Sequence, residues 1–329
     1  MVFMRKITFI ALVVAMAVSC LVSCGGSNAG KDADDATSSV KFPALPSVPS
    51  TLSDPSAAAT YVAQRYWNKF FSQYRANPTD STMILGVAND DMELAMGTFA
   101  SILESGVSIK DGQQAMKIFF DLMEDVEAED PSSSTYERLA DLTEKYFYDP
   151  NSPVRNEDLY LAFVESLASS KCTDPNLVPS YKYTISMCSL NKVGTPAADF
   201  SFKDINGKVN SLYKIKAETT LLFFSNPGCP SCSEIISALM NDMRVEALVS
   251  RERLSVVNIY IDEEIDLWKD YVKTYPKTWI NGYDHKYKIR NDVSYNVRAI
   301  PSLYILDADK KVIMKDATQD AVIGYLRSL

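Results

Sequence analysis

Two cysteines at Cys-x-x-Cys spacing, Cys229 and Cys232, are the residues of this chain whose type and position could do chemistry. A thiol pair at this spacing can exchange with a disulfide, because one thiolate attacks and the second thiol resolves the mixed disulfide. The attacking sulfur needs a lowered pKa, which the positive end of a helix and its unpaired N–H groups provide. We therefore predict that Cys229 attacks and that Cys232, one turn deeper, resolves.

The residues before the dithiol predict an element that would deliver it to a helix terminus. Leu221–Phe224 is an apolar run typical of a strand buried on both faces, and the Asn226–Gly228 segment has the chemistry of a turn. Pro230 suits the first position of a helix, and apolar residues recur at helical spacing from Ile235 onward. We expect a strand, a turn and a helix that begins at the cysteine.

The first 23 residues predict a secretory signal. Arg5 and Lys6 precede an apolar run from Ile7 to Val18 that is too short to span a bilayer well. The sequence Leu-Val-Ser-Cys that ends at Cys24 resembles the lipobox of bacterial lipoproteins, so Cys24 is the expected site of lipid attachment. Cys20 is a poorer second candidate, and a plain cleaved signal peptide is the alternative. We expect an exported protein that is lipid-anchored in the cell envelope and faces the periplasm.

Length and composition allow two domains behind this signal. The chain has 329 residues, of which 47% are hydrophobic and 23% charged. Its formal charge of −9 becomes about −11 without the signal, so nucleic acid is not an expected partner. We expect a flexible tether over 24–57, a helical domain over 58–170, a connector over 171–191 and a second domain over 192–329.

Residues 58–170 have helical periodicity and few β-branched runs, which predicts an all-α domain. The expected helices lie around Asp91–Glu104, Gln113–Glu127, Ser134–Tyr148 and Asn156–Ser169, after a first helix with Tyr61, Val62, Tyr66, Phe70, Phe71 and Tyr74 on one side. Asp111 and Ser134 are candidate caps. Aromatic residues at helical spacing are typical of a core rather than of a ligand site. These are Trp67, Phe70, Phe119, Phe120, Tyr146 and Phe147.

The connector holds two further cysteines, Cys172 and Cys188. In an exported protein we expect them to form a structural disulfide, which would stabilise the connector by about 3 kcal/mol in the chain-entropy model. The alternative is a second redox pair that exchanges with Cys229 and Cys232, although the spacing forms no redox motif.

After the connector, strand and helix patterns alternate. The expected strands are Asp199–Phe202 and Val209–Leu212 around Asn206-Gly207, then Leu221–Phe224, Leu254–Ile261, Ser302–Leu306 and Lys311–Met314. The expected helices are Ser231–Val249, Asp266–Tyr275 and Gln319–Leu329. This order predicts an α/β domain with a central mixed sheet flanked by helices. With the all-α domain in front, the chain as a whole is predicted to be α+β.

Three motifs in order resemble the TlpA/ResA group of membrane-tethered thioredoxin-like proteins. They are the Val193–Phe200 segment, the Cys-Pro-Ser-Cys dithiol and the Val297–Ser302 segment, and the resemblance covers roughly residues 190–329. It implies a thioredoxin-like fold and a thiol-disulfide oxidoreductase that acts on protein thiols and disulfides. Ahead of it, the Tyr148–Glu157 segment resembles part of a helical domain of unknown function found in lipoproteins of this type.

The resemblance also implies roles for residues near the dithiol. Pro301 is expected to be cis and to face the dithiol, with Ile300, Pro230 and Ser231 contacting the substrate. Many thioredoxins bury an acid on the strand before the dithiol, and this strand carries none. Glu234 could transfer protons through water in its place, although an acid in a helix's first turn also has the ordinary explanation of the helix dipole.

The direction of electron flow and the partners are further expectations. Ser231 stands where strong oxidants have a thiolate-stabilising histidine, which favours a reductase. No flavin, nicotinamide or phosphate-loop motif is present, so we expect no cofactor and a separate electron-donor protein. The alternatives are a non-enzymatic lipoprotein that binds a partner, and a copper- or other metal-handling module, since Cys-x-x-Cys is also half a metal site. The single histidine, His285, is expected to be solvated rather than a ligand, so no metal site is assigned.

Overall fold

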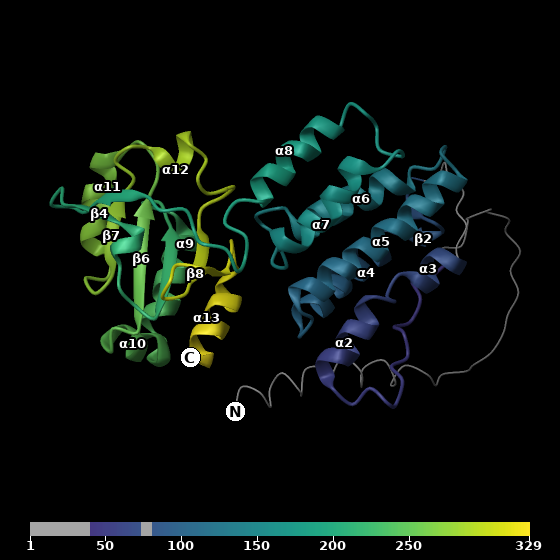
Figure 1. Ribbon diagram of the computed structural model, residues 1–329, viewed down its shortest axis with the longest axis horizontal. Coiled ribbons are helices and arrows are strands. Elements are labelled where there is room, and N and C mark those ends of the chain that lie inside the picture. Colours follow the sequence, from purple (N-terminus) through teal and green to yellow (C-terminus); the bar gives the residue numbers. More distant parts are fainter. Residues whose placement is uncertain (1–39, 74–80) are drawn as a thin grey trace, which may run out of the picture. The chain divides into compact units, whose positions relative to one another are not determined.

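The computed structural model describes residues 40–73 and 81–329. The predicted signal peptide (residues 1–23) and Cys24 lie outside the described residues, as does the first part of the predicted tether. In Figure 1 the elements of the helical domain run from purple to teal, and those of the following domain from green to yellow. None of the helices in the described ranges is both long enough and apolar enough to cross a membrane.

The helical domain has the helices predicted for residues 58–170, except that the first is split in two, and a further helix, α8 (Val178–Cys188), lies in the predicted connector. Its helices are α2 (Pro55–Ala63), α3 (Asn68–Gln73), α4 (Asn89–Glu104), α5 (Ile109–Glu129), α6 (Thr135–Phe147), α7 (Glu157–Ser169) and α8 (Val178–Cys188). A short antiparallel hairpin, β1 (Met83–Ile84) with β2 (Val87–Ala88), precedes α4. The split after α2 comes at Gln64, whose N–H reaches back to the carbonyls of Thr60 and Val62.

Side chains at the helix ends satisfy N–H groups that have no partner within the helix. The Oγ atom of Ser108 accepts a hydrogen bond from the Asp111 N–H at 3.1 Å, so the cap of α5 is Ser108 and the predicted cap Asp111 lies in the first turn. Asn156 caps α7 by accepting from the Leu159 N–H at 3.1 Å. Ser134 is at the cap position of α6 but makes no side-chain capping bond. These caps fix where the helices begin.

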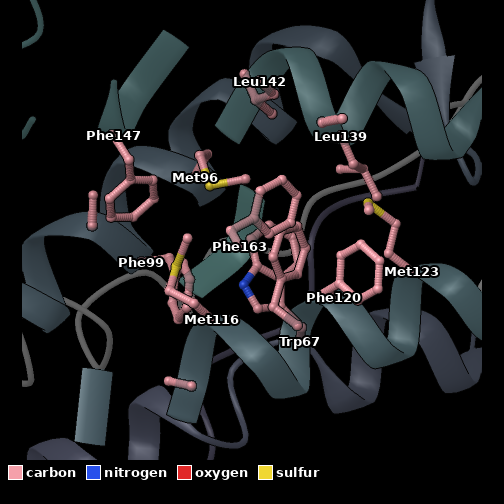
Figure 2. Close-up of a cluster of buried hydrophobic side chains, with 14 of the residues drawn as sticks. Trp67, Met96, Phe99, Met116, Phe120, Met123, Leu139, Leu142, Phe147 and Phe163 are labelled. Atoms are coloured by element: carbon pink, nitrogen blue, oxygen red, sulfur yellow. The ribbon is translucent and has the colours of Figure 1, made fainter. Parts of the chain in front are cut away.

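Aromatic side chains form the core of the helical domain, as predicted. Trp67 lies 4.6 Å from Phe119 and 5.7 Å from Phe99 between ring centroids. Figure 2 shows Trp67, Phe99 and Phe163 gathered in the interior among Met and Leu side chains. Of the six aromatic residues named from the sequence, those fully enclosed are Trp67, Phe70, Phe119, Phe120 and Phe147. Tyr146 is half-buried, and its hydroxyl donates to the carbonyl of Glu93 at 2.9 Å.

The second domain is built on a mixed seven-stranded sheet of order β4-β3-β7-β6-β5-β8-β9. The strands are β3 (Ser201–Lys203), β4 (Val209–Ser211), β5 (Thr219–Phe224), β6 (Leu254–Tyr260), β7 (Ile280–Tyr283), β8 (Ser302–Leu306) and β9 (Val312–Met314). The strand β5 is central, because it pairs in parallel with β6 and antiparallel with β8. All six of its residues are buried, which confirms the prediction of a strand covered on both faces.

Helices cover this sheet, and one predicted helix is two. They are α9 (Pro230–Met240), α10 (Met243–Ser250), α11 (Ile265–Tyr271), α12 (Lys288–Asn291) and α13 (Gln319–Ser328), with short 3-10 turns η1 (Leu212–Lys214) and η2 (Val272–Thr274). The chain breaks after α9 because the Asp242 carboxylate caps a new helix, accepting from the N–H groups of Arg244 and Val245. The observed α+β architecture is the one predicted from the sequence.

Candidate functional site

The dithiol lies where β5 gives way to α9, and Cys229 is the N-cap of that helix. Its backbone is extended, with φ −73° and ψ 116°, and Pro230 occupies the first helical position. Gly228 precedes it with φ +70°, a left-handed conformation that side chains rarely adopt, so the turn requires glycine. The Sγ atom of Cys229 accepts a hydrogen bond from the Cys232 N–H at 3.2 Å. The helix terminus therefore offers a hydrogen bond to the sulfur, as the sequence predicted.

The two thiols differ in exposure. Cys229 is half-buried, whereas only 1% of Cys232 is exposed. Burial, and after it the neighbouring Cys229, raise the pKa of the Cys232 thiol to about 12. Cys232 is therefore protonated at neutral pH, and Cys229 is the sulfur that a macromolecular disulfide can approach. This arrangement fits attack by Cys229 followed by resolution by Cys232.

The Ile300–Pro301 peptide bond is cis, as predicted. Pro301 comes directly before β8, and the register of β5 with β8 pairs Phe224 with Ser302. Pro301 thus stands at the same end of the strand pair as the turn that carries the dithiol. Ile300 is half-buried and packs against the core of this domain.

A groove of about 320 Å³ runs beside the buried thiol. It is bordered by the turn, by α9 and by the segment that includes η2. Its lining residues are Asn226, Gly228, Cys232, Ser233, Ile236, Ser237, Met240, Asn241, Tyr271, Thr274 and Tyr275. No carboxylate is among these residues of the described chain. Met240 at its rim is 55% exposed, so the groove presents apolar surface to solvent next to the dithiol.

A chain of hydrogen-bonded polar side chains, which was not predicted from the sequence, begins at the turn with the buried residues Ser225 and Asn258. The Ser225 hydroxyl donates to Oδ1 of the Asn258 side chain, and Nδ2 of Asn258 donates to Oδ1 of Asn281 at 3.1 Å. Asn281 in turn donates to the Pro276 carbonyl, also at 3.1 Å. The signal was the polar residue Asn258 between the apolar residues Val257 and Ile259 of β6. The chain ties the start of the dithiol turn to β6 and β7.

The other site residues predicted from the sequence lie on the exposed side of α9 or nearby. Pro230 and Ser231 are exposed beside Cys229, where a docked substrate could reach them. Glu234 is also exposed on α9, and it does not line the groove that holds Cys232. The structure therefore brings Cys229, Cys232, Pro230 and Ser231 together and leaves Glu234 on the solvent side of the helix.

Cys172 and Cys188 are both free thiols, which differs from the disulfide predicted from the sequence. The connector between them is not irregular, because α8 fills most of it and ends at Cys188. Lys315 Nζ contacts both Glu157 and the Cys188 carbonyl, so Cys188 lies near the start of α7, whereas Cys172 follows the end of that 13-residue helix. The two cysteines are therefore separated by roughly the length of α7, about 20 Å, well beyond the roughly 7 Å that a disulfide allows between Cα atoms. Cys188 is fully buried in the helical core, and burial raises the pKa of its thiol to about 12. Its inaccessibility also speaks against the alternative of a second redox pair.

A metal-handling module was one of the alternatives left open by the sequence. Within the described ranges, no three or more Cys, His, Asp or Glu side chains are placed to hold a metal ion. His285 is half-buried, and burial lowers its pKa.

Comparison with known proteins gives matches to both halves of the chain. Residues 23–191 match the family described as a domain of unknown function (DUF5106), and residues 217–312 match a thioredoxin-like family. The thiol-disulfide oxidoreductase ResA of Bacillus cereus is 25% identical over 141 residues, which is 42% of this chain and 79% of ResA.

Solved structures from Bacteroides are similar too. A thioredoxin-like protein from Bacteroides caccae is 33% identical with a TM-score of 0.74, over 88% of this chain and 99% of that chain. The C-terminal domain of an uncharacterized protein from Bacteroides fragilis is 42% identical with a TM-score of 0.41, over 42% of this chain and 98% of that domain.

Proposed function

The chain belongs to the thioredoxin-like proteins, as a homologue of thiol-disulfide oxidoreductases with a DUF5106 domain in front, and from this premise we propose that it is an exported, membrane-tethered reductase of protein disulfides. The observation that carries the proposal is the asymmetry of the dithiol. Cys229 is the accessible cap of α9, and Cys232 is enclosed one turn away. A partner's disulfide can therefore reach only one of the two sulfur atoms.

The reaction proceeds in two exchange steps. The Cys229 thiolate attacks one sulfur of the substrate disulfide, which forms a mixed disulfide and releases the first substrate thiolate. Cys232 then loses its proton and attacks Cys229 Sγ, which forms the Cys229–Cys232 disulfide and releases the second substrate thiolate. The substrate gains two electrons and two protons. The dithiol of a separate donor protein restores the reduced enzyme by the reverse exchange.

Reduction of insulin or of a scrambled protein disulfide tests the activity. The full chain should reduce these substrates in the presence of a small dithiol, and Cys229→Ser should abolish turnover. A partner-binding lipoprotein without redox function would give no turnover in either form. The midpoint potential against glutathione or dithiothreitol tests the direction, within the range of about −270 to −120 mV known for this fold. A value near the oxidising end would overturn the assignment as a reductase.

The membrane tether rests on the lipobox alone. A chain lipidated at Cys24 should incorporate labelled fatty acid in the bacterial host and remain with the membrane fraction. Cys24→Ala should abolish the label, whereas Cys20→Ala should keep it. Label that persists in Cys24→Ala, or a chain released without lipid, would contradict the proposed anchor.

A further inference from the structure

Arg298 lies three residues before the cis proline and is held on three sides. Its Nε atom lies 2.8 Å from Glu157 Oε1, and its Nη2 atom donates to Asp316 Oδ2 at 2.8 Å. The guanidinium carbon also lies 4.2 Å from the centroid of the Tyr148 ring. Only 11% of the arginine side chain is exposed. Its position, and with it that of the preceding part of the proline loop, is therefore fixed by these neighbours.

The residue on the other side of the cis proline is also hydrogen-bonded to Asp316. Asp316 Oδ1 accepts a hydrogen bond from the hydroxyl of Ser302, the residue after Pro301, at 2.8 Å. Asp316 therefore bridges Arg298 and Ser302, which flank the proline in sequence. Both Ser302 and Asp316 are buried, so this bridge is shielded from water.

The helical domain supplies Glu157 and Arg155 to this cluster, and Lys315 comes from the segment after β9; all of them lie in the single compact unit Ser39–Arg327. Glu157, the first residue of α7, pairs through Oε2 with Lys315 Nζ at 2.6 Å, and it accepts a hydrogen bond from the Asn296 amide at 2.9 Å. The side chains of Glu157 and Lys315 are each 1% exposed. Arg155 donates from Nε to the Asp316 carbonyl at 3.0 Å. The end of the Tyr148–Glu157 segment thus contacts the segment that contains the cis proline.

Burying the charged carboxylate of Glu157 costs free energy unless nearby positive charges compensate it. Burial raises the pKa of Glu157, and the charges of Lys315 and Arg298 oppose that rise. Removing the carboxylate would leave Arg298 with Asp316 and the Tyr148 ring, without its contact to Glu157, and would allow it to change rotamer. Glu157 belongs to the helical domain and pairs with residues of the second domain. It is therefore well placed to fix the position of one relative to the other.

From these contacts we propose that Glu157 is a positioning residue, through which the helical domain sets the geometry of the Val297–Ser302 loop that receives the substrate chain. The kinetic consequence rests on the proposed reductase function, whereas the effect on the loop does not. The helical domain would then be part of the substrate site, in addition to any role as a spacer.

The test replaces Glu157 by Gln in the full chain, which removes the charge and keeps the size. We expect KM for a protein disulfide to rise at least about fivefold with kcat little changed, a coupling of ordinary size between two sites. The alkylation rate of Cys229 by iodoacetamide, which does not use the loop, should stay the same. Glu157→Asp should restore part of the affinity. In a double-mutant cycle, Glu157→Gln should add little to Arg298→Met if the two act as a pair.

A second readout works whether or not the chain is a reductase. Hydrogen exchange of the amides at 297–303 should quicken in Glu157→Gln. Ser133→Ala, which removes the hydroxyl that accepts from the Thr135 N–H at the start of α6, at the opposite end of that helix from Tyr148, is the control for loss of helical stability and should leave these amides and KM as they are. If Glu157→Gln does not fold, Asn296→Ala is used in its place, because it removes one hydrogen bond to the Glu157 carboxylate. Unchanged KM and unchanged loop exchange would overturn the inference, while absent wild-type turnover with faster loop exchange would overturn the proposed function alone.

Discussion

The Cys232 N–H donates a hydrogen bond to Cys229 Sγ at 3.2 Å, which joins the two members of the dithiol across one turn of α9. The bond places a backbone N–H of the helix N-terminus against the Cys229 sulfur. The same turn encloses the Cys232 side chain. One backbone arrangement therefore gives one accessible sulfur, which suits the proposed attacking role, and one enclosed sulfur, which suits the proposed resolving role.

The first prediction concerns the mixed disulfide. Cys232→Ala should stall the reaction after the first exchange and accumulate one covalently bound substrate chain at Cys229, because the resolving thiol is absent. Non-reducing electrophoresis followed by mass spectrometry measures this product. Cys172→Ala removes another partly buried thiol and is the matched control, in which no such product should accumulate. A stable adduct in the control, or none in Cys232→Ala, would contradict the assigned roles.

The second prediction concerns the pH dependence of Cys232. Its folded pKa is raised to about 12, so the native state holds the thiol proton more tightly than the unfolded chain, whose thiols titrate near 8.5. The stability contributed by this group is fully present below about pH 8.5 and is lost as the pH rises toward about 12. In Cys229→Ser, the alkylation rate of Cys232 should still be rising at about pH 10, in contrast to urea-unfolded protein. A plateau near pH 9 in the folded protein would rule out the raised pKa.

The third prediction compares two glycines. A Cβ atom on Gly282 in β7 would lie 2.4 Å from the Phe202 ring and 3.0 Å from the Lys203 carbonyl oxygen. Gly282→Ala should therefore lower the free energy of unfolding by about 1–3 kcal/mol through overpacking. Gly324 in α13 has no atom within 4 Å of such a Cβ, so Gly324→Ala should raise it by up to about 1 kcal/mol. Chemical denaturation measures both changes, and equal effects would contradict the packing described at β7.

The fourth prediction concerns the polar chain under the dithiol turn. Asn258→Ala removes the partner of both Ser225 and Asn281 in a buried place, which should lower the free energy of unfolding by about 1–3 kcal/mol. Ser255→Ala in the same strand is the control and should change stability by no more than about 0.5 kcal/mol. Urea unfolding monitored by tryptophan fluorescence gives both values. A neutral Asn258→Ala would mean that water satisfies these groups equally well.

The fold was predictable wherever local pattern and burial agreed. The long amphipathic helices were predicted because apolar residues at helical spacing mark one buried face. The strand β5 was predicted because its continuous apolar run indicates burial on both faces. The strand β7 was missed, since its Asn281-Gly282 pair is typical of a turn. There the glycine is required by Phe202 packing close above the strand, a contact between segments about 80 residues apart that no local pattern reveals.

The candidate site divides in the same way. Cys229, Cys232 and the cis proline are short motifs, so sequence alone located them. The groove and the chain from Ser225 to Asn281 are assembled from separate elements, and only the folded chain brings them together. The helix α8 in the connector was not predicted because its polar and apolar residues show no clear helical period. Without that helix the connector was expected to be irregular, which allowed a disulfide between Cys172 and Cys188 to be predicted.

The antiparallel pairing of β5 with β8 has a consequence for the order in which the protein folds. Contacts in the helical domain join helices that are near each other in sequence, so this half can fold while the rest of the chain is still emerging. The central strand of the sheet must wait for residues 302–306, close to the end of the chain. Until then the dithiol turn lacks its neighbouring strand, and its two thiols are exposed to whatever oxidants and folding factors the nascent chain meets.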